Sequence, residues 1–221
     1  MTIEEYLQEQ FPSLELIPSI YNQWDIGIHF SLGKSSYLLK ENDEMNLEGF
    51  QVIYKQTSQI FNELFDQNDE LFLVTNLYKQ IKEKSTKKLK VYQPYLKDHN
   101  SLNRILVKTY PYPFELEEEE ELEMQQFSLF CKRKDLHVAG LLKAACNEDF
   151  PLKPKFGGYY IGYPDVFFVN TTKDIIFFIY DDRGCEVIAL DAERIRPLYE
   201  KYYDCIEEVD RKRVEPLLKK K

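Results

Sequence analysis

The segment from Ile175 to Leu190 constrains the fold more than any other part of this 221-residue chain. It starts with an apolar run, Ile175 to Tyr180, and ends with another, Glu186 to Leu190. Residues 181–184, between the runs, are of the types that form tight turns, because aspartate bonds its own backbone and glycine tolerates positive φ. The pattern predicts a hairpin. Its first strand is apolar on both faces, so we expect it in the centre of a sheet that is covered on both sides.

The rest of the chain alternates between helical and extended periodicity. Thr2 and Glu5 have the spacing of a capping box, and Asn46 precedes the clearest amphipathic stretch, so both places are expected helix starts. Helices are predicted over 2–11, 46–65, 136–147, 191–206 and 210–218, and strands over 25–33, 71–75, 103–110, 126–131, 165–170, 174–180 and 186–190. Residues 79–90 fit neither period and are expected to form an exposed loop or the end of a helix.

These elements predict an α+β fold with an antiparallel or mixed sheet and helices mainly on one face. At the C-terminus we expect a three-stranded β-meander followed by a helix. A Pro- and Gly-rich stretch over 149–162 is the best place for a boundary. It would separate an N-terminal α+β region, 1–150, from a meander-plus-helix unit, 151–221. One continuous domain is the alternative.

Composition argues against several classes of protein. Eight glycines are too few for a Gly-rich phosphate loop or a dinucleotide fingerprint, so no cofactor is expected. The three histidines and four cysteines have no metal-ligand spacing, which predicts free thiols at Cys131, Cys146, Cys185 and Cys205. The N-terminal residues have neither a basic start nor an apolar run, and no stretch approaches the length of a membrane span. A soluble cytoplasmic protein is therefore the expectation.

Charge is distributed unevenly along the chain. The formal net charge is −9, and residues 1–80 by themselves carry −9. A second acidic segment is the glutamate run, which consists of Glu117, Glu118, Glu119, Glu120 and Glu121. This balance repels nucleic acid and favours a basic protein partner, for which the run is a candidate contact surface. The alternative is that the run is a solvated link between two paired strands.

A basic cluster between Lys82 and Lys90 precedes Tyr92 and Tyr95. Basic and aromatic residues in this combination can hold single-stranded nucleic acid. In a chain that is acidic as a whole, we expect the cluster to pair with the glutamate run instead. Nucleic acid binding is therefore not expected.

The charged turn contains the other candidate binding residues, Asp181, Asp182 and Arg183. In a structural account, the aspartates and the glycine reverse the chain while Arg183 pairs with a nearby carboxylate. In a functional account, two carboxylates and a guanidinium at a strand end bind an anion or a metal. Adjacent strand residues point to opposite faces, so the carboxylates converge only if the turn rotates one of them. We favour the structural account and predict no catalytic residue and no metal ligand; His29 is expected to be structural.

The same segment resembles a motif of a bacterial family of uncharacterised proteins. In that family an apolar run leads into Tyr-Asp-Asp-Arg-Gly and then Val-Ile-Ala, followed by a helix that contains Leu-Tyr. Here the matching residues are Phe178 to Gly184, Val187 to Ala189, Leu198 and Tyr199. The resemblance is strong over 177–190 and looser over most of the chain. It implies a C-terminal domain of unknown function and brings no known activity.

Two hypotheses for the function follow. In the first, the protein is a non-catalytic acidic interaction protein, such as an immunity-type binder that neutralises a basic toxin. In the second, it is an enzyme that uses Asp181, Asp182 and Arg183 on a phosphorylated or carboxylated small molecule. Converging carboxylates beside a pocket would favour the second hypothesis, whereas an internal ion pair would not. The sequence leaves the oligomeric state open.

Overall fold

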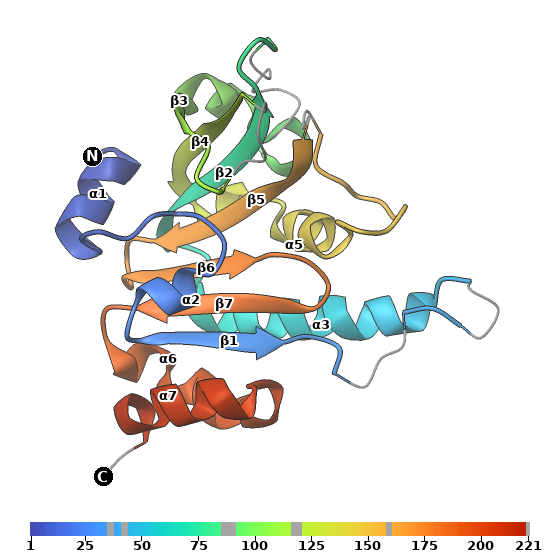
Figure 1. Cartoon of the computed structure of the whole chain (residues 1–221), viewed down its shortest axis with the longest axis vertical. Helices are drawn as coiled ribbons and strands as arrows, with labels where there is room; N and C mark the ends of the chain where they lie inside the picture. The colour runs from blue at the N-terminus through green and yellow to red at the C-terminus, as the bar shows by residue number, and fades with distance from the viewer. Residues whose placement is uncertain (35–37, 41–43, 85–91, 116–120, 158–160, 220–221) are drawn as a thin grey trace.

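The computed structural model describes residues 1–34, 38–40, 44–84, 92–115, 121–157 and 161–219. Its centre is a seven-stranded sheet in which neighbouring strands are antiparallel (Figure 1). The strands are β1 (Gly27–Ser31), β2 (Glu70–Gln80), β3 (Leu106–Pro111), β4 (Leu122–Lys132), β5 (Ile161–Asn170), β6 (Ile175–Ile179) and β7 (Gly184–Ala189). Their order across the sheet is β1-β7-β6-β5-β2-β4-β3. The predicted α+β class is confirmed.

The helices begin where the sequence provides caps. They are α1 (Ile3–Gln10), α2 (Ile20–Gln23), α3 (Leu47–Leu64), α5 (Val138–Cys146), α6 (Ala192–Lys201) and α7 (Glu208–Leu218), with 3-10 turns at Gln93–Tyr95, His99–Arg104, Arg133–Asp135 and Tyr203–Cys205. Thr2 and Glu5 form the predicted capping box, and the Asn46 side chain accepts the N–H of Gly49 at 3.4 Å. Within the described residues, none of the helices has both the length and the apolar character needed to cross a membrane.

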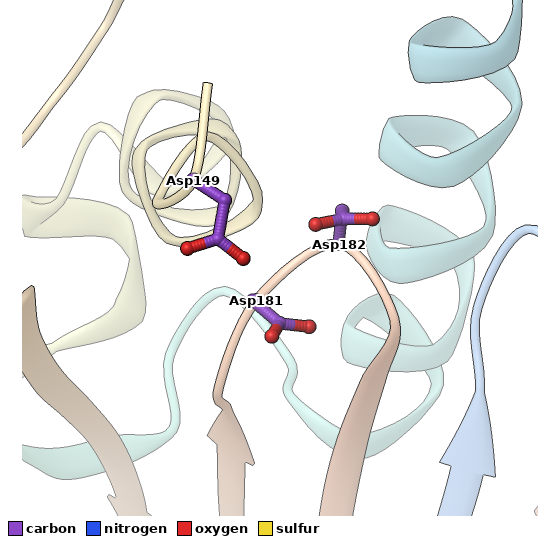
Figure 2. A group of neighbouring side chains, drawn as sticks. All are labelled: Asp149, Asp181 and Asp182. Atoms are coloured by element: carbon purple, nitrogen blue, oxygen red, sulfur yellow. The ribbon is translucent and has the colours of Figure 1, made fainter. Parts of the chain in front are cut away.

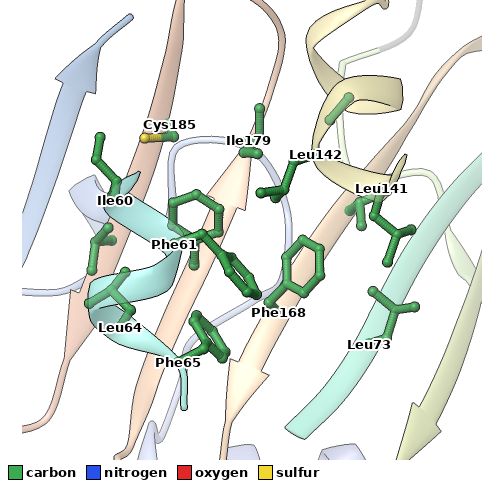
Figure 3. Packing of buried hydrophobic residues seen from close by; sticks show 14 of the residues in the cluster. Ile60, Phe61, Leu64, Phe65, Leu73, Leu141, Leu142, Phe168, Ile179 and Cys185 are labelled. Carbon is green, nitrogen blue, oxygen red and sulfur yellow. The ribbon is translucent and has the colours of Figure 1, made fainter. Parts of the chain in front are cut away.

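The larger hydrophobic core lies between the sheet and helices α3, α5, α6 and α7. Figure 3 shows the part of this core where α3 and α5 pack on the sheet. Phe61 on α3 and Phe65, the C-cap of this helix, stack with ring centroids 4.3 Å apart. Phe61 also meets the edge of Phe168 on β5 at 4.9 Å. The apolar stripe of α3 therefore packs directly on the central strands, as its spacing predicts.

The opposite face of the sheet is covered by α1, α2 and the segment that joins them (Figure 1). Phe11 and Ile20 of this cover are completely buried in a cluster with Phe167 and Phe178 from the sheet. Among the described helices, α3, α5, α6 and α7 thus share one face, and the shorter α1 and α2 cover the other. This arrangement agrees with the prediction of helices mainly on one face.

The predicted hairpin is also confirmed. Strand β6 lies between β5 and β7, and all five of its residues are buried. Phe177 pairs with Phe168 on one side and with Val187 on the other. Strands β5, β6 and β7 form the expected meander, which α6 follows. Asp191 caps that helix by accepting the N–H of Glu193 at 2.9 Å.

Two predictions at element boundaries are wrong. Lys79 and Gln80, expected in an exposed loop or a helix end, belong to β2. Lys79 is only 2% exposed, because its Nζ lies 2.5 Å from a Glu123 carboxylate oxygen and donates to a backbone carbonyl at 2.9 Å. These partners compensate the ammonium for the hydration that it loses on burial. The first residues of the predicted strand 103–110 are helical instead, in the 3-10 turn that ends at Arg104.

Strands from both predicted regions of the chain share the sheet. β1 pairs with β7, and β2 pairs with β5, so N-terminal strands lie on both sides of the C-terminal meander. The division of the chain at residue 150 stays a prediction. What matters for the sites below is that the sheet places distant segments beside one another.

Candidate functional site

The charged turn is built around Asp181. One carboxylate oxygen accepts the backbone N–H of Arg183 at 2.7 Å, and the other accepts the Nε–H of the same arginine at 2.7 Å and also its Nη2–H. The Arg183 carbonyl accepts the N–H of Leu32, just beyond β1, at 2.7 Å. Asp181 is buried, whereas the arginine side chain is 71% exposed. The local bonds are those of a turn whose aspartate organises the backbone.

Two adjacent carboxylates of the turn nevertheless come together, and a third joins them. Oxygens of Asp149, Asp181 and Asp182 lie within 4.8 Å of one another, around the tip of the β6–β7 turn (Figure 2). Residues 181–183 are bends rather than strand, so the alternation that separates neighbouring strand side chains does not apply. Asp149 follows α5, and sequence spacing gave no signal that it would reach this turn.

The convergence changes the acidity of one group. Burial and the neighbouring Asp181 carboxylate raise the pKa of Asp182 to about 6, and Asp149 adds to this effect. Three carboxylates in this arrangement are the ligand type that hard divalent cations use. Asp181, however, already binds the Arg183 guanidinium, which also lies 5.9 Å from the centre of the Tyr180 ring. The guanidinium is thus engaged within the turn.

A row of polar side chains crosses the sheet on the face that α1 and α2 cover. The strand registers align Gln126, Asn76 and Asp165, and Tyr180 follows at the end of β6. The Gln126 amide donates to Asn76 Oδ1 at 3.0 Å, and Tyr78 donates its hydroxyl hydrogen to Asp165. Burial raises the pKa of Asp165 to about 7, although the Tyr78 hydrogen bond lowers it.

The row ends at His29, which the sequence predicts to be structural. The His29 Nε2 lies 2.9 Å from the Tyr180 hydroxyl, and its Nδ1 lies 3.8 Å from Asp210 on α7. Burial lowers the pKa of His29, while Asp210 and other nearby acids act in the opposite direction. Gly184 lies beneath the tyrosine ring, where any Cβ would overlap the Tyr180 hydroxyl. The histidine therefore joins β1, the turn and α7 through polar contacts.

A groove of about 620 Å³ lies at the other end of this face, between α1 and the end of β3. Its walls come from α1, the segment 13–17 and the residues 110–113, with Met124 and Gln126 of β4 also lining it. The lining is mainly apolar and aromatic. Among the described lining residues, the charged ones are Glu4 and Glu15. Sequence periodicity could not find this groove, because its two walls are about 100 residues apart in the chain.

Glu4 fastens α1 to the edge strand beside the groove. Its Oε1 lies 2.7 Å from Lys108 Nζ and accepts the Tyr110 hydroxyl hydrogen at 2.9 Å. Its Oε2 is buried and accepts no hydrogen bond from the described part of the chain. Burial raises the pKa of Glu4, but hydrogen bonding, chiefly from Lys108, outweighs burial and lowers the pKa to about 2. The carboxylate is therefore ionised at neutral pH.

The glutamate run lies in the connection between β3 and β4, which pair with each other as a hairpin. This agrees with the expectation that the run links two paired strands. Glu117, Glu118, Glu119 and Glu120 lie outside the described residues, whereas Glu121 is exposed and its carbonyl accepts the N–H of Ile81 at 2.9 Å. A second hollow of about 520 Å³ lies against this hairpin, lined by Ile81, Thr109, Tyr110, Pro111, Tyr112, Leu122 and Glu123.

Other residues that the sequence analysis singled out are only partly described. In the basic cluster, Lys82 and Lys84 are placed, and Lys87, Lys88 and Lys90 lie outside the described residues. The pairing of this cluster with the glutamate run stays a prediction. The four cysteines are free thiols, as predicted: Cys131, Cys146 and Cys185 are buried, and Cys205 is half-buried.

Comparison with known proteins places the chain in a family. A family model described as a domain of unknown function, DUF3885, matches residues 3–210. The chain belongs to this family. The uncharacterized protein YnaE of Bacillus subtilis strain 168 is 69% identical over 209 residues, which cover 94% of this chain and 98% of that protein. No solved structure matches the chain.

The family match confirms the expected bacterial family of uncharacterised proteins. It also corrects one detail, because the matching domain extends over nearly the whole chain instead of only its C-terminal part. Helices α1 and α3 and the groove beside β3 therefore lie within the family domain.

Proposed function

We propose that this protein is a non-catalytic interaction protein that binds a basic segment of a partner protein in the groove between α1 and β3. The observation that carries the proposal is the chemistry of the groove lining. Its described charged residues are two glutamates, and the other lining residues are apolar, aromatic or uncharged polar. An occupant that matches this lining carries apolar side chains and positive charge.

The surroundings of the groove support the same kind of partner. The sequence between β3, which carries Tyr110, and β4 contains the glutamate run and so adds further negative charge to the chain. The chain as a whole has a net charge of −9. Long-range attraction of this kind speeds the encounter with a basic protein and weakens as salt is added. An immunity-type protein that neutralises a basic toxin is the most specific form of this proposal.

The edge of the sheet offers a second means of attachment. In the described structure β3 pairs with β4 on one side only, and the side chains of Leu106 and Val107 are 49% and 36% exposed. An exposed edge strand can accept an extended segment through backbone hydrogen bonds. Pro111 lacks a donor and ends the edge, so the available stretch is short. A basic segment in extended conformation fits both the groove and this edge.

The enzymatic alternative has less support from the geometry. The carboxylates of Asp181 and Asp182 do converge, which a cation or substrate site would require. Arg183, however, forms an internal ion pair with Asp181, so it is not directed towards a ligand. An arginine engaged in this way favours a turn-stabilising role for the three residues.

The proposal is tested with short peptides and a matched pair of variants. Fluorescence anisotropy would measure binding of an alternating Arg-Val peptide, with a Glu-Val peptide of equal length for comparison. Gln8→Lys places a positive charge in the groove, and Gln59→Lys makes the same change at an exposed site on α3, on the other face of the sheet. We expect the Arg-Val peptide to bind, and Gln8→Lys to weaken binding about tenfold, the factor that corresponds to ~1.4 kcal/mol.

Two outcomes would contradict the proposal. The first is that the wild-type protein binds the Arg-Val and Glu-Val peptides equally weakly at low salt. The second is that Gln8→Lys and Gln59→Lys reduce binding by the same factor, since binding would then follow net charge and not the groove.

A further inference from the structure

We propose that Lys108 is an internal substitute for a partner's arginine, and that this arginine displaces Lys108 from Glu4 when the partner binds. The inference rests on the proposed function and goes further by naming the residue type that the groove recognises. It assigns to Glu4 the role of anchoring residue. It assigns to Lys108 the role of an internal competitor that lowers the affinity for the partner.

The first argument is that the Glu4 carboxylate is only half satisfied. Lys108 and Tyr110 both bond Oε1, at 2.7 Å and 2.9 Å, whereas Oε2 is buried and no donor among the described residues has good hydrogen-bond geometry towards it. Thr2 and the Glu4 backbone also lower the pKa of this carboxyl, but less than Lys108 does. A buried charged oxygen without a donor is unfavourable. Glu4 lines the groove. If its carboxylate turns towards the groove, a ligand that donates to both oxygens would supply the donor that Oε2 lacks.

The second argument is the geometry of the two basic side chains. A lysine ammonium acts as a point charge, whereas an arginine guanidinium presents parallel N–H groups that can bond both oxygens of one carboxylate. Lys108 is attached to the strand edge and reaches one oxygen only. An arginine that enters through the groove would replace one ionic hydrogen bond with two.

The third argument is that Lys108 can leave at small cost. Its side chain is 51% exposed, and that of Glu4 is 34% exposed. Ion pairs with this exposure contribute little to stability, and a released lysine regains its hydration. Tyr110 keeps its own bond to Glu4. Displacement would therefore leave α1 attached to β3.

The occupant we assign is a separate basic protein, because charge complementarity favours it over a second copy of this acidic chain. Sedimentation of the wild-type protein and of Gln8→Lys distinguishes the two. A dimer that Gln8→Lys dissociates would mean that a second copy occupies the groove, which would overturn the assignment.

The central experiment uses opposite changes at one position. Binding of the Arg-Val peptide is measured for the wild type, Lys108→Gln and Lys108→Arg, with a Lys-Val peptide of equal charge for comparison. Removing the competitor should tighten binding of the Arg-Val peptide about threefold, the fold-change that corresponds to a partly exposed ion pair, and a resident arginine should weaken binding by a similar factor. In the wild type, the Arg-Val peptide should bind more tightly than the Lys-Val peptide.

Lys212 provides the matched controls, because it is an exposed lysine paired with Glu208 at 2.6 Å on α7. Lys212→Gln and Lys212→Arg reproduce the two charge changes away from the groove. Equal effects of Lys108→Gln and Lys212→Gln, or unchanged binding in Lys108→Arg, would overturn the inference. If the peptide still binds in a manner sensitive to Gln8→Lys, the proposed function survives that result. Circular dichroism of each variant checks that the fold is intact.

Discussion

At the scale of single residues, the most consequential side chain under the N-terminal cover is Glu186 on β7. It is 3% exposed, and its two oxygens accept the N–H groups of Ser19 at 3.2 Å and Tyr21 at 3.4 Å. Ser19 has φ 71°, a left-handed conformation that costs energy in a non-glycine residue. The buried acid therefore stabilises a strained entry into α2.

The same residue makes stability depend on pH. Burial raises the pKa of Glu186 from 4.5 to about 7, although the backbone donors lower it. Between about pH 4.5 and pH 7, the carboxyl of Glu186 is deprotonated in the unfolded state and protonated in the folded state. The free energy of unfolding therefore falls as pH rises through this range. Glu186→Gln removes this contribution. Urea denaturation at each pH gives the free energy of unfolding of the variant minus that of the wild type. This difference should rise by about 3 kcal/mol between pH 4 and pH 8.

Glu200→Gln changes an exposed glutamate on α6 and serves as the control for this measurement. The explanation fails if the stability difference between Glu186→Gln and the wild type is the same at both pH values. It also fails if the Glu200→Gln difference shifts by as much, since the effect would then belong to net charge.

At the scale of elements, α3 and the central strands form a unit held by aromatic contacts. Phe61 is completely buried and meets Phe65, Phe168 and Phe177 at centroid distances of 4.3, 4.9 and 5.5 Å. Such edge and stacked contacts add to the free energy gained by burying the rings. Aromatic packing therefore attaches α3 to the central strands of the sheet.

We expect Phe61→Ala to lower the free energy of unfolding by about 3–5 kcal/mol, the usual range for removing a buried phenylalanine. Alanine favours helix formation, so a loss would reflect packing and not helix propensity. Phe130→Ala, at a position that is 39% exposed on β4, is the comparison and should cost clearly less. Chemical denaturation measures both, and equal losses would contradict this account of the core.

Helices and strands could be predicted from the sequence where the signals that specify them lie within a few residues of one another. The capping box at Thr2, the cap at Asn46 and the apolar run of β6 each specify structure within a few residues. The approach of Asp149 to Asp181 was not predictable, because it depends on how α5 packs against the meander. The groove was missed for the same reason, since Glu4 and Tyr110 meet only in the folded chain.

At the scale of the whole molecule, the sheet has a protected centre and unequal edges. β5 and β6 are covered on both faces, whereas the residues of β3 are largely exposed and pair on one side within the described structure. Local openings release exposed edges before the core, so stability should differ across the sheet.

Hydrogen exchange tests this gradient. Amides of 175–179 should exchange only through global unfolding, whereas amides of 106–111 should exchange through smaller openings and much faster. Mass spectrometry of peptic fragments, or NMR, measures both rates under the same conditions. Equal protection of the two segments would mean that β3 is covered by something beyond the structure described here.

The pairing of β1 with β7 has a consequence for how the protein is made. Residues 27–31 leave the ribosome early. Their hydrogen-bonding neighbours at 184–188 are translated much later, and only α6, a 3-10 turn and α7 are described after them. Until then the nascent chain carries an incomplete sheet, and parts of it are open to aggregation or to a chaperone. A chain on a ribosome stalled before β7 would therefore lack the strand with which β1 pairs, and the duration of the stall would not change this.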